Sequence, residues 1–366
     1  MPDVELVDVT KRYGRIVAND HVNLTIRDRE YVSILGPSGC GKSTLIQCIT
    51  GIIRPDEGDI FFSGQKVTQL PMEDRGIGYV FQNIALFPHM NVWENVTYAP
   101  FIRGRPIRET RPLALEMLEM VRLGADTEDF PAELSRGSQQ KTAIARSLVS
   151  QAKLLIFDEP LGSLDARIRS DLRYELRRLV KDLGLTALHV THDQEEAMSI
   201  SDRVIVMKAG RIMEVNDPIQ LWRRPMHLFT ANFVGEANFM EGRVAGVKGA
   251  GRTVIQLADG LPLIVREGRY DVGEKIVVTV RPQFVALHDP ARENQLDGRI
   301  VDVIYTGNLW YLTIQLANGV RITVKTPVET RRSFTVDDEV TLSIAPDDLL
   351  LYRYPERGLE AEIALE

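Results

Sequence analysis

The sequence has only two cysteines in 366 residues, Cys40 and Cys48. Both lie on or beside one expected helix, where a spacing of eight residues corresponds to about 12 Å at about 1.5 Å per residue. That distance is too long for a disulfide bond. We therefore expect two free thiols, which are typical of the reducing cytoplasm.

Long apolar runs are also missing. No stretch approaches the 18 consecutive apolar residues of a membrane-spanning helix, and the first thirty residues contain no apolar core of a signal peptide. We expect neither a transmembrane helix nor a secretory signal. A role at a membrane would then require docking onto other subunits.

Positive charge is not in excess. Lysine and arginine number 44 against 51 aspartates and glutamates, so the net charge is -7 and no basic footprint indicates a nucleic-acid partner. The basic stretch 173–181 is interrupted by acidic and apolar residues and is typical of a solvated helix face. With 44% hydrophobic and 26% charged residues, the composition is that of a soluble globular protein. Its length predicts two or three domains.

Up to about residue 235, β-type runs alternate with helical runs, which predicts an α/β domain over 1–235 with a largely parallel sheet. Residues 88–152 are mostly helical, with Leu113, Met117 and Met120 on one face, and we interpret them as a helical subdomain inserted in the sheet. We expect strands at 31–35, 78–81, 153–157, 187–191 and 203–207, and helices at 41–50, 138–149, 166–183 and 194–200.

Residues 236–366 show short alternating strands, an all-β signature. This region repeats itself in order: EGRV at 241–244 recurs as DGRI at 297–300, QLADG at 256–260 as QLANG at 315–319, and VRP at 280–282 as IAP at 344–346. Asp259-Gly260 and Asn318-Gly319 would each close a tight hairpin. The repeat predicts two intertwined barrel-like modules; the alternative is unrelated hairpins that share turn chemistry.

A glycine-rich segment fits the pattern G-x-x-x-x-G-K-[ST]. It follows the apolar run 31–35 and opens the helical run, the context that supports a phosphate-binding loop. Its glycines let backbone N–H groups turn inward toward phosphate oxygens, and the helix N-terminus favours an anion. We expect Lys42 to reach the β- and γ-phosphates and Ser43 to bind Mg²⁺. The residues expected to contact ATP are Gly36, Pro37, Ser38, Gly39, Cys40, Gly41, Lys42, Ser43 and Thr44.

Two carboxylates end the apolar run at 154–157. Asp158 is expected to hold Mg²⁺ through water, because open α/β sheets bind ligands at the carboxyl ends of their strands. Glu159 is the candidate general base for the attacking water. Paired carboxylates at a strand end are common, so the phosphate-binding loop upstream is what makes this pattern specific.

The segment LSRGSQQ at 134–140 precedes a helix. Together with the two motifs above it resembles the signature of ABC transporter ATPases, LSGGQ. In that family the signature faces the γ-phosphate bound by the partner subunit. Ser135 and Gly137 match the pattern, whereas Arg136 and Ser138 replace the usual Gly and Gln. Either this loop tolerates the change, or this chain pairs with a different ATPase that carries a standard signature.

The resemblance implies further site residues. Tyr13 matches the aromatic residue that stacks on adenine, although taken alone a packing role is the commoner one. Gln82 matches the glutamine that touches Mg²⁺ and the attacking water, and the following segment 83–95 resembles the part that docks the permease. Asp165, in Ser163-Leu-Asp165, matches the D-loop, and His192 the switch histidine that contacts the γ-phosphate. A metal role for His189 has no second ligand pattern to support it.

The region after residue 238 is similar to the TOBE/OB-like regulatory barrels of maltose, polyamine and ferric-iron importer ATPases, and residues 233–239 look more like the polyamine, iron and phosphonate branch. The resemblance implies a magnesium-dependent ATPase subunit of a binding-protein-dependent importer on the cytoplasmic face of the inner membrane. Its solute would be a polyamine, ferric iron, a phosphonate, or a sugar or polyol. Implied partners are a second ATPase subunit (identical or different), the permease and, indirectly, a solute-binding protein, but no nucleic acid. The alternatives are a soluble ABC ATPase unrelated to transport and a ligand sensor with weak ATPase activity.

Overall fold

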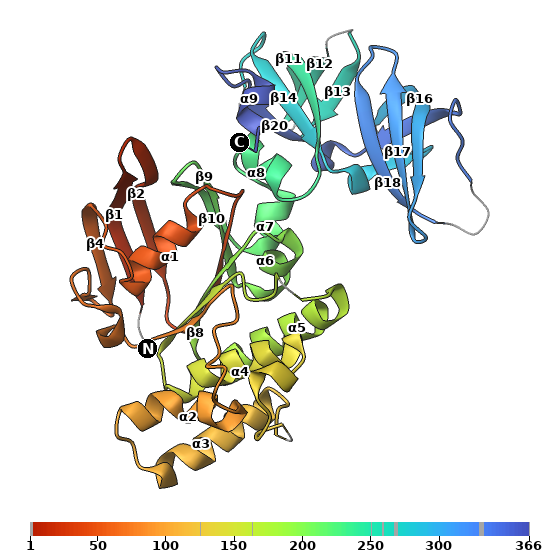
Figure 1. The fold of residues 1–366 in the computed structure, drawn as a ribbon. Helices are drawn as coiled ribbons and strands as arrows, with labels where there is room; N and C mark the ends of the chain where they lie inside the picture. The colour runs from red at the N-terminus through yellow and green to blue at the C-terminus, as the bar shows by residue number, and fades with distance from the viewer. Residues whose placement is uncertain are drawn as a thin grey trace. The chain divides into compact units, whose positions relative to one another are not determined.

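A computed structural model describes residues 3–365 except 125, 163, 250, 258–259, 267–269 and 329–332. The chain divides into two compact units, Met1–Arg223 and Arg224–Glu366 (Figure 1). The predicted boundary at 235/236 falls inside the second unit. Ser163 and Asp259, which belong to the predicted D-loop and to the first predicted hairpin turn, lie outside the described residues.

The centre of the first unit is a six-stranded sheet in the order β10-β9-β3-β8-β7-β6. Five strands run parallel and β10 pairs antiparallel with β9. Because both faces are covered, most residues of the parallel strands are buried, as expected of such sheets. The strands are β3 (Tyr31–Leu35), β6 (Ile77–Val80), β7 (Leu154–Asp158), β8 (Thr186–Thr191), β9 (Arg203–Lys208) and β10 (Arg211–Asn216).

A second sheet of the first unit is antiparallel and packs against α1 (Lys42–Thr50). Its order is β2-β1-β4-β5, with β1 (Val4–Tyr13), β2 (Ile16–Ile26), β4 (Glu57–Phe62) and β5 (Gln65–Lys66). Ile26 and Ile60 of this sheet share one buried apolar core with Ile46 and Ile49 of α1. These four strands were not among those expected from the sequence.

Helices form the remainder of the first unit, and α2, α3 and α4 gather at the end of it away from α1 (Figure 1). Helix α2 begins with a capping box, in which Asn91 and Glu94 bond each other's backbone N–H groups. The helices are α2 (Val92–Ile102), α3 (Ile107–Met120), α4 (Arg136–Val149), α5 (Ala166–Asp182), α6 (Gln194–Ile200) and α7 (Pro218–Arg223), with short 3₁₀ turns η1 (Met72–Asp74) and η2 (Pro131–Glu133).

The second unit contains two five-stranded sheets that share one apolar core. One sheet has the order β13-β12-β11-β14-β20, the other β15-β19-β16-β17-β18. Helices α8 (Leu228–Phe233) and α9 (Leu359–Ile363) complete it. The first six elements are β11 (Asn238–Lys248), β12 (Arg252–Leu257), β13 (Pro262–Val265), β14 (Lys275–Val280), η3 (Pro282–Phe284) and β15 (Val285–Leu287). The second six are β16 (Asn294–Tyr305), β17 (Leu309–Leu316), β18 (Arg321–Pro327), β19 (Glu339–Ile344), η4 (Pro346–Asp348) and β20 (Leu350–Arg353).

These two sets of elements are the two sequence repeats, and they exchange their last strands. β15 ends the first repeat but pairs with β19 of the second, and β20 ends the second repeat but pairs with β14 of the first. Equivalent glycines occupy equivalent sites: a Cβ on Gly242 would lie 2.7 Å from Ile255 Cγ2, and one on Gly298 would lie 2.6 Å from Ile314 Cγ2. The repeats are therefore intertwined, and the predicted fold class, a P-loop α/β unit with a helical part followed by an all-β unit, is confirmed.

Candidate active site

The phosphate-binding loop connects β3 to α1. Gly39 and Gly41 have φ of 77° and 103°, values that side chains with a Cβ rarely adopt. A Cβ on Gly41 would also lie 2.1 Å from the carbonyl oxygen of Ala18. The loop thus needs glycine at this position both for its backbone conformation and for the close approach of the strand beside it.

Lys42 closes over this loop. Its Nζ donates hydrogen bonds to the carbonyl oxygens of Gly36 at 2.7 Å and Pro37 at 2.8 Å, and the side chain is buried. Ser43, one residue along α1, is exposed. The cation therefore lies in the cradle that the loop forms, where phosphate oxygens can replace the two carbonyl groups as its partners.

Asp158 ends β7, and its carboxylate accepts a hydrogen bond from the hydroxyl of Tyr79 on the neighbouring strand β6 at 2.7 Å. Burial raises the pKa of Asp158, an effect that the nearby charge of Glu159 strengthens and that of Lys42 opposes. Burial likewise raises the pKa of the Tyr79 phenol, so the phenol stays a donor. Nothing in the sequence alone singled out Tyr79, because its position beside Asp158 follows from the pairing of two strands that are far apart in the chain.

Glu159 has an unusual backbone, with φ at 45°. A non-glycine residue in this left-handed region is strained by about 1–3 kcal/mol and persists where its surroundings hold it. Here the N–H of Glu159 donates to the carbonyl oxygen of Val190 in β8 at 2.9 Å. This hydrogen bond to the neighbouring strand thus fixes the direction in which the side chain of Glu159 points at the end of β7.

Three of the predicted catalytic residues meet at one atom. Oε2 of Glu159 accepts a hydrogen bond from Nε2 of Gln82 at 2.9 Å and lies 3.3 Å from Nδ1 of His192. Gln82 follows β6, Glu159 follows β7 and His192 follows β8, which are adjacent in the sheet. The group forms because the carboxyl ends of parallel strands lie at one edge of the sheet.

The oxygen atoms at this edge suit Mg²⁺. A serine hydroxyl, a carboxylate and an amide oxygen, from Ser43, Asp158 and Gln82, are hard ligands of the type this ion prefers, with water and phosphate completing its shell. Within the described ranges no group of three or more His, Cys, Asp or Glu side chains could hold a metal by itself. The residues present therefore fit an ion that is bound together with nucleotide phosphates.

The signature residues lie at a separate place. Ser135 caps α4 by accepting a hydrogen bond from the N–H of Ser138 at 3.1 Å. A Cβ on Gly137 would lie 3.1 Å from Ile168 Cγ2 of α5, so the first turn of α4 packs against that helix. Arg136 is exposed and forms no ion pair with the side chains that the structure describes. In the described part of the chain, no hydrogen bond or ion pair joins Ser135 or Gly137 to the phosphate-binding loop.

Asp165 and Tyr13 are likewise apart from the Glu159 group. Asp165 caps α5, and its carboxylate accepts a hydrogen bond from the N–H of Ile168 at 3.0 Å. Tyr13 ends β1 with its side chain 48% exposed, and it belongs to neither apolar core that the described residues of this unit form. Nζ of Lys11 lies 5.6 Å from the centre of its ring.

His189 is a core residue. Its Nδ1 lies 3.0 Å from the hydroxyl of Tyr31 and its Nε2 lies 3.1 Å from a carboxylate oxygen of Glu196, and all three side chains are buried. Burial by itself would raise the pKa of Glu196, but the charge and hydrogen bond of His189 lower it overall. His189, three residues before His192, thus holds α6 against the sheet through Glu196, a support that no sequence pattern indicated.

Comparison with known proteins now identifies the family. The profile of the ABC transporter family matches residues 19–162, and that of the TOBE domain matches residues 278–351. The chain is 37% identical over 361 residues to a spermidine/putrescine import ATP-binding protein PotA of Nitrosospira multiformis, which covers 96% of this chain and 99% of the relative. It is 40% identical to the PotA protein of Marinobacter nauticus over 87% of this chain and 86% of that one.

The chain belongs to the family of ABC transporter ATP-binding proteins. Its first unit is similar to the dimeric cassette MJ0796 bound to ADP and Pi, with 34% identity and a TM-score of 0.53 over 59% of this chain and 98% of that one. It is also similar to cbiO1 of Clostridium perfringens, with 30% identity and a TM-score of 0.57 over 60% and 89% of the two chains. This ABC protein is an ATPase whose cassette binds ATP.

None of the helices that the structure describes has the length and apolar character needed to span a lipid bilayer.

Proposed function

We propose that this ABC ATPase is the ATP-hydrolysing subunit of an importer whose solute is a polyamine. Two observations support the proposal. The relatives that carry the name spermidine/putrescine import ATP-binding protein align along nearly the whole chain, including the all-β unit. The residues expected to hydrolyse ATP are all present, and Glu159, Gln82 and His192 are in contact at one edge of the sheet.

The contact at Oε2 of Glu159 is the observation that carries the catalytic part. A carboxylate can act as general base when it lies within hydrogen-bond reach of the water it activates. Gln82 orients this carboxylate, and His192, whose side chain is 61% exposed, is free to contact a γ-phosphate beyond it. Lys42 would bind the β- and γ-phosphates, and Tyr13 would stack on the adenine.

Magnesium would be held by Ser43, Asp158 and Gln82, and it would neutralise charge on the phosphate oxygens. Asp158 can serve in this role once bound cationic charge lowers its raised pKa. The hydrogen bond from Tyr79 then keeps the carboxylate in a fixed orientation.

Ser135, Gly137 and Asp165 would act on the nucleotide of a second ATPase subunit. Within one subunit they have no link to the phosphate-binding loop, whereas their helix N-termini offer N–H groups and a positive dipole end to an anion. Two subunits, identical or different, would thus form two composite sites on a permease at the cytoplasmic face of the membrane. A solute-binding protein would deliver the polyamine from the other side.

The test is transport by the reconstituted complex. The ATPase, its permease and its binding protein in proteoliposomes should take up labelled spermidine or putrescine in an ATP-dependent manner, and Glu159→Gln should abolish uptake. Ferric iron, a phosphonate and a sugar serve as competing solutes. ATP-driven uptake of one of these without uptake of polyamine would overturn the solute, and ATP hydrolysis without any dependence on the permease would overturn the transport role.

A further inference from the structure

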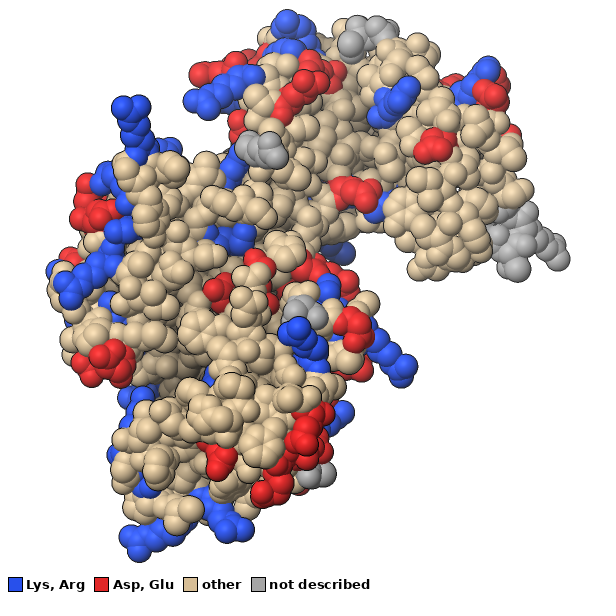
Figure 2. All heavy atoms as spheres, in the orientation of Figure 1, with Lys and Arg blue, Asp and Glu red and all other residues tan. Residues whose placement is uncertain are grey.

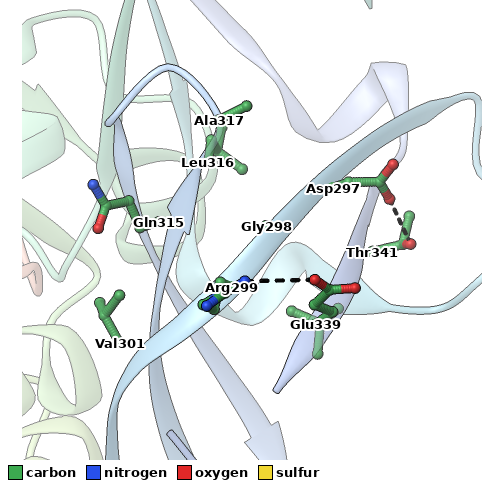
Figure 3. A pocket seen from close by; sticks show the side chains of 10 residues that line it. Asp297, Gly298, Arg299, Val301, Gln315, Leu316, Ala317, Glu339 and Thr341 are labelled. Atoms are coloured by element: carbon green, nitrogen blue, oxygen red, sulfur yellow. Dashed lines mark hydrogen bonds and ion pairs between the residues drawn. The ribbon is translucent and has the colours of Figure 1, made fainter. Parts of the chain in front are cut away.

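A groove of about 690 Å³ crosses β16, β17 and β19 in the second unit. Figure 3 shows its charged side chains paired with one another: Asp297 accepts a hydrogen bond from Thr341, and Arg299 pairs with Glu339. Because these groups have partners within the groove, they do not by themselves indicate a ligand. Charged side chains with a more specific arrangement lie in the first unit, along α5.

Helix α5 carries four cations at intervals of four residues, a spacing that places side chains on the same face of a helix. We call this set the basic row, and its members are Arg169, Arg173, Arg177 and Lys181. The sequence predicted a solvated face for 173–181. That holds for Arg178, which is exposed, but Arg173 is buried and the other members of the row are half-buried. Figure 2 shows acidic side chains beside basic ones on the visible face of the first unit.

Three members of the basic row hold α6 and the residues that follow it. Nη1 of Arg173 lies 3.1 Å from a carboxylate oxygen of Glu195 in α6. Nη2 of Arg177 lies 3.2 Å from the carboxylate of Asp202, and Lys181 pairs with the same carboxylate. These ion pairs join α5 to both ends of α6, so a shift of one helix displaces the other.

Arg169, the first member of the row, joins two loops. Its Nη2 donates a hydrogen bond to the carbonyl oxygen of Leu164, one residue before Asp165, at 2.8 Å. Its Nη1 lies 3.6 Å from a carboxylate oxygen of Asp193, one residue after His192. A guanidinium presents several N–H donors in one fixed plane and can therefore hold two partners at once. Arg169 thus connects the D-loop to the switch loop within one subunit.

The contacts of Asp193 extend this connection to His192. One carboxylate oxygen of Asp193 caps α6 by accepting a hydrogen bond from the N–H of Glu196 at 3.0 Å, and the other faces Arg169. The N–H of Asp193 donates to the hydroxyl of Thr191 at 2.9 Å. Because His192 lies between these two anchored residues, its position depends on where Arg169 holds Asp193.

We propose that Arg169 is a positioning residue that couples the two composite ATP sites of the assembled importer. This inference rests on the proposed function, in which His192 acts on the nucleotide of its own subunit and Asp165 on that of the second subunit. A change at one site that moves the loop of Asp165 would also move the loop of His192 at the other site. Chains of hydrogen bonds and ion pairs of this kind carry energetic coupling between sites. The coupling does not depend on which solute is imported.

The test is the dependence of ATP hydrolysis on ATP concentration, measured on the importer complex in proteoliposomes. The parent should give a Hill coefficient above about 1.5, since the limit for a pair of sites is about 2. Arg169→Gln should lower the Hill coefficient to about 1 and reduce turnover at saturating ATP by about tenfold, because His192 is then less well placed. The affinity of the purified chain for ATP should stay within about twofold of the parent, a split between binding and turnover that a general loss of structure would not produce.

Asp193→Asn tests the same connection from its other end. Asparagine still caps a helix but removes the negative charge that faces Arg169, so this variant should show the same fall in the Hill coefficient. Because both changes break one connection, the double variant should be no worse than either single variant. Arg178→Gln is the matched control and should equal the parent, since Arg178 is an exposed arginine of the same helix that pairs with Asp182 at 3.3 Å.

Several results would overturn the inference. A parent complex without cooperativity would mean that the two sites act independently, and an unchanged Hill coefficient in Arg169→Gln would remove this residue from their coupling. Additive losses in the double variant would mean that Arg169 and Asp193 act separately. A lower melting temperature together with weaker ATP binding would make the role of Arg169 purely structural. These results leave the proposed function standing. A parent complex that hydrolyses no ATP, or a Glu159→Gln complex as active as the parent, would overturn the proposed function and the inference with it.

Discussion

The two units build their polar sites by different routes. In Met1–Arg223, residues that follow three adjacent parallel strands converge, so that Gln82 and His192 reach the carboxylate of Glu159. In Arg224–Glu366, two copies of one strand pattern interlock by exchanging β15 and β20. The first arrangement produces one site at one edge of one sheet. The second produces pairs of equivalent places, one in each repeat.

Buried asparagines show the pairing of equivalent places. Asn238 donates to the carbonyl oxygen of Thr323 and accepts from its N–H, at 2.8 and 2.7 Å. Asn294 makes the same two bonds to Ile264, at 2.9 and 2.7 Å. Each asparagine thus ties the start of its own repeat to the third strand of the other repeat. These two equivalent places have therefore stayed alike in the two repeats.

The largest expected effect tests the site of the first unit. Glu159→Gln should lower ATP turnover by about 10²–10⁴-fold while ATP still binds, because the loss of a positioned general base has an effect of this size. Steady-state hydrolysis and nucleotide binding of the purified chain are the measurements. Glu116→Gln, an exposed residue of α3, is the control and should match the parent. Turnover of the Glu159 variant within threefold of the parent would remove Glu159 from this role.

The next effect tests whether the repeats of the second unit depend on each other. A chain that ends at residue 349 lacks β20 and therefore the buried side chain of Leu351. We expect the second unit to lose at least about 3 kcal/mol of stability, the order of one large core truncation, while the first unit keeps its ATP-dependent melting transition. A chain that ends at residue 355 retains β20 and is the control.

If the shortened chain ending at residue 349 kept a native melting transition in the second unit, the strand exchange would not be required for folding.

A shorter chain that ends at residue 235 tests the other unit. It should remain folded and bind ATP, since the apolar cores that the described residues of Met1–Arg223 form contain no described residue of the second unit. An aggregated product would show that the all-β unit completes the cassette.

A smaller effect tests the equivalence of the two repeats. Asn238→Ala and Asn294→Ala should each lower the free energy of unfolding by about 1–3 kcal/mol, because each removes two hydrogen bonds to a partly buried backbone N–H and carbonyl group. Chemical denaturation of the two variants should give similar losses. Asn308→Ala, at an exposed turn, should change little. A loss confined to one of the two buried asparagines would contradict their equivalence.

The smallest effect concerns Tyr13. Tyr13→Ala should weaken ATP affinity by about 1–2 kcal/mol, the order of one lost stacking contact, and leave turnover at saturating ATP largely unchanged. Tyr13→Trp should bind ATP nearly as well as the parent. Equal losses in both variants, measured by nucleotide titration, would indicate that the ring serves a structural purpose in the hairpin of β1 and β2.

The sequence predicted the bounds of an element most accurately where the local residue pattern agrees with the place of that element in the folded structure. The strand at 31–35 and the helix at 194–200 have the predicted bounds, and the strand before Asp158 is shifted by one residue. Apolar runs of this length between helices can be buried only in a covered sheet. The phosphate-binding loop could be predicted for a similar reason, because the local backbone conformation requires its glycines.

The N-terminal sheet was missed because its alternation is interrupted. Strands β1 and β2 are long, but their pairing shifts between Leu6 and Val9 and again between Val9 and Lys11. Asp8 and His21 have φ of 57° and 49° at these irregularities. Each β-bulge inserts an extra residue and moves the following side chains to the other face, so a period of two does not persist along the strand.

The sequence by itself determined the order of the elements, the loop around Lys42, the carboxylates after β7 and the existence of two β repeats, because each depends on residues that are neighbours in the chain. Only the tertiary structure decided that Tyr79 bonds Asp158, that the backbone of Val190 holds Glu159 in a left-handed conformation, and that β15 and β20 change places. These features depend on which strands lie side by side. Many apolar strands could pair with one another equally well on local grounds. The packing of the whole core determines which strands become neighbours.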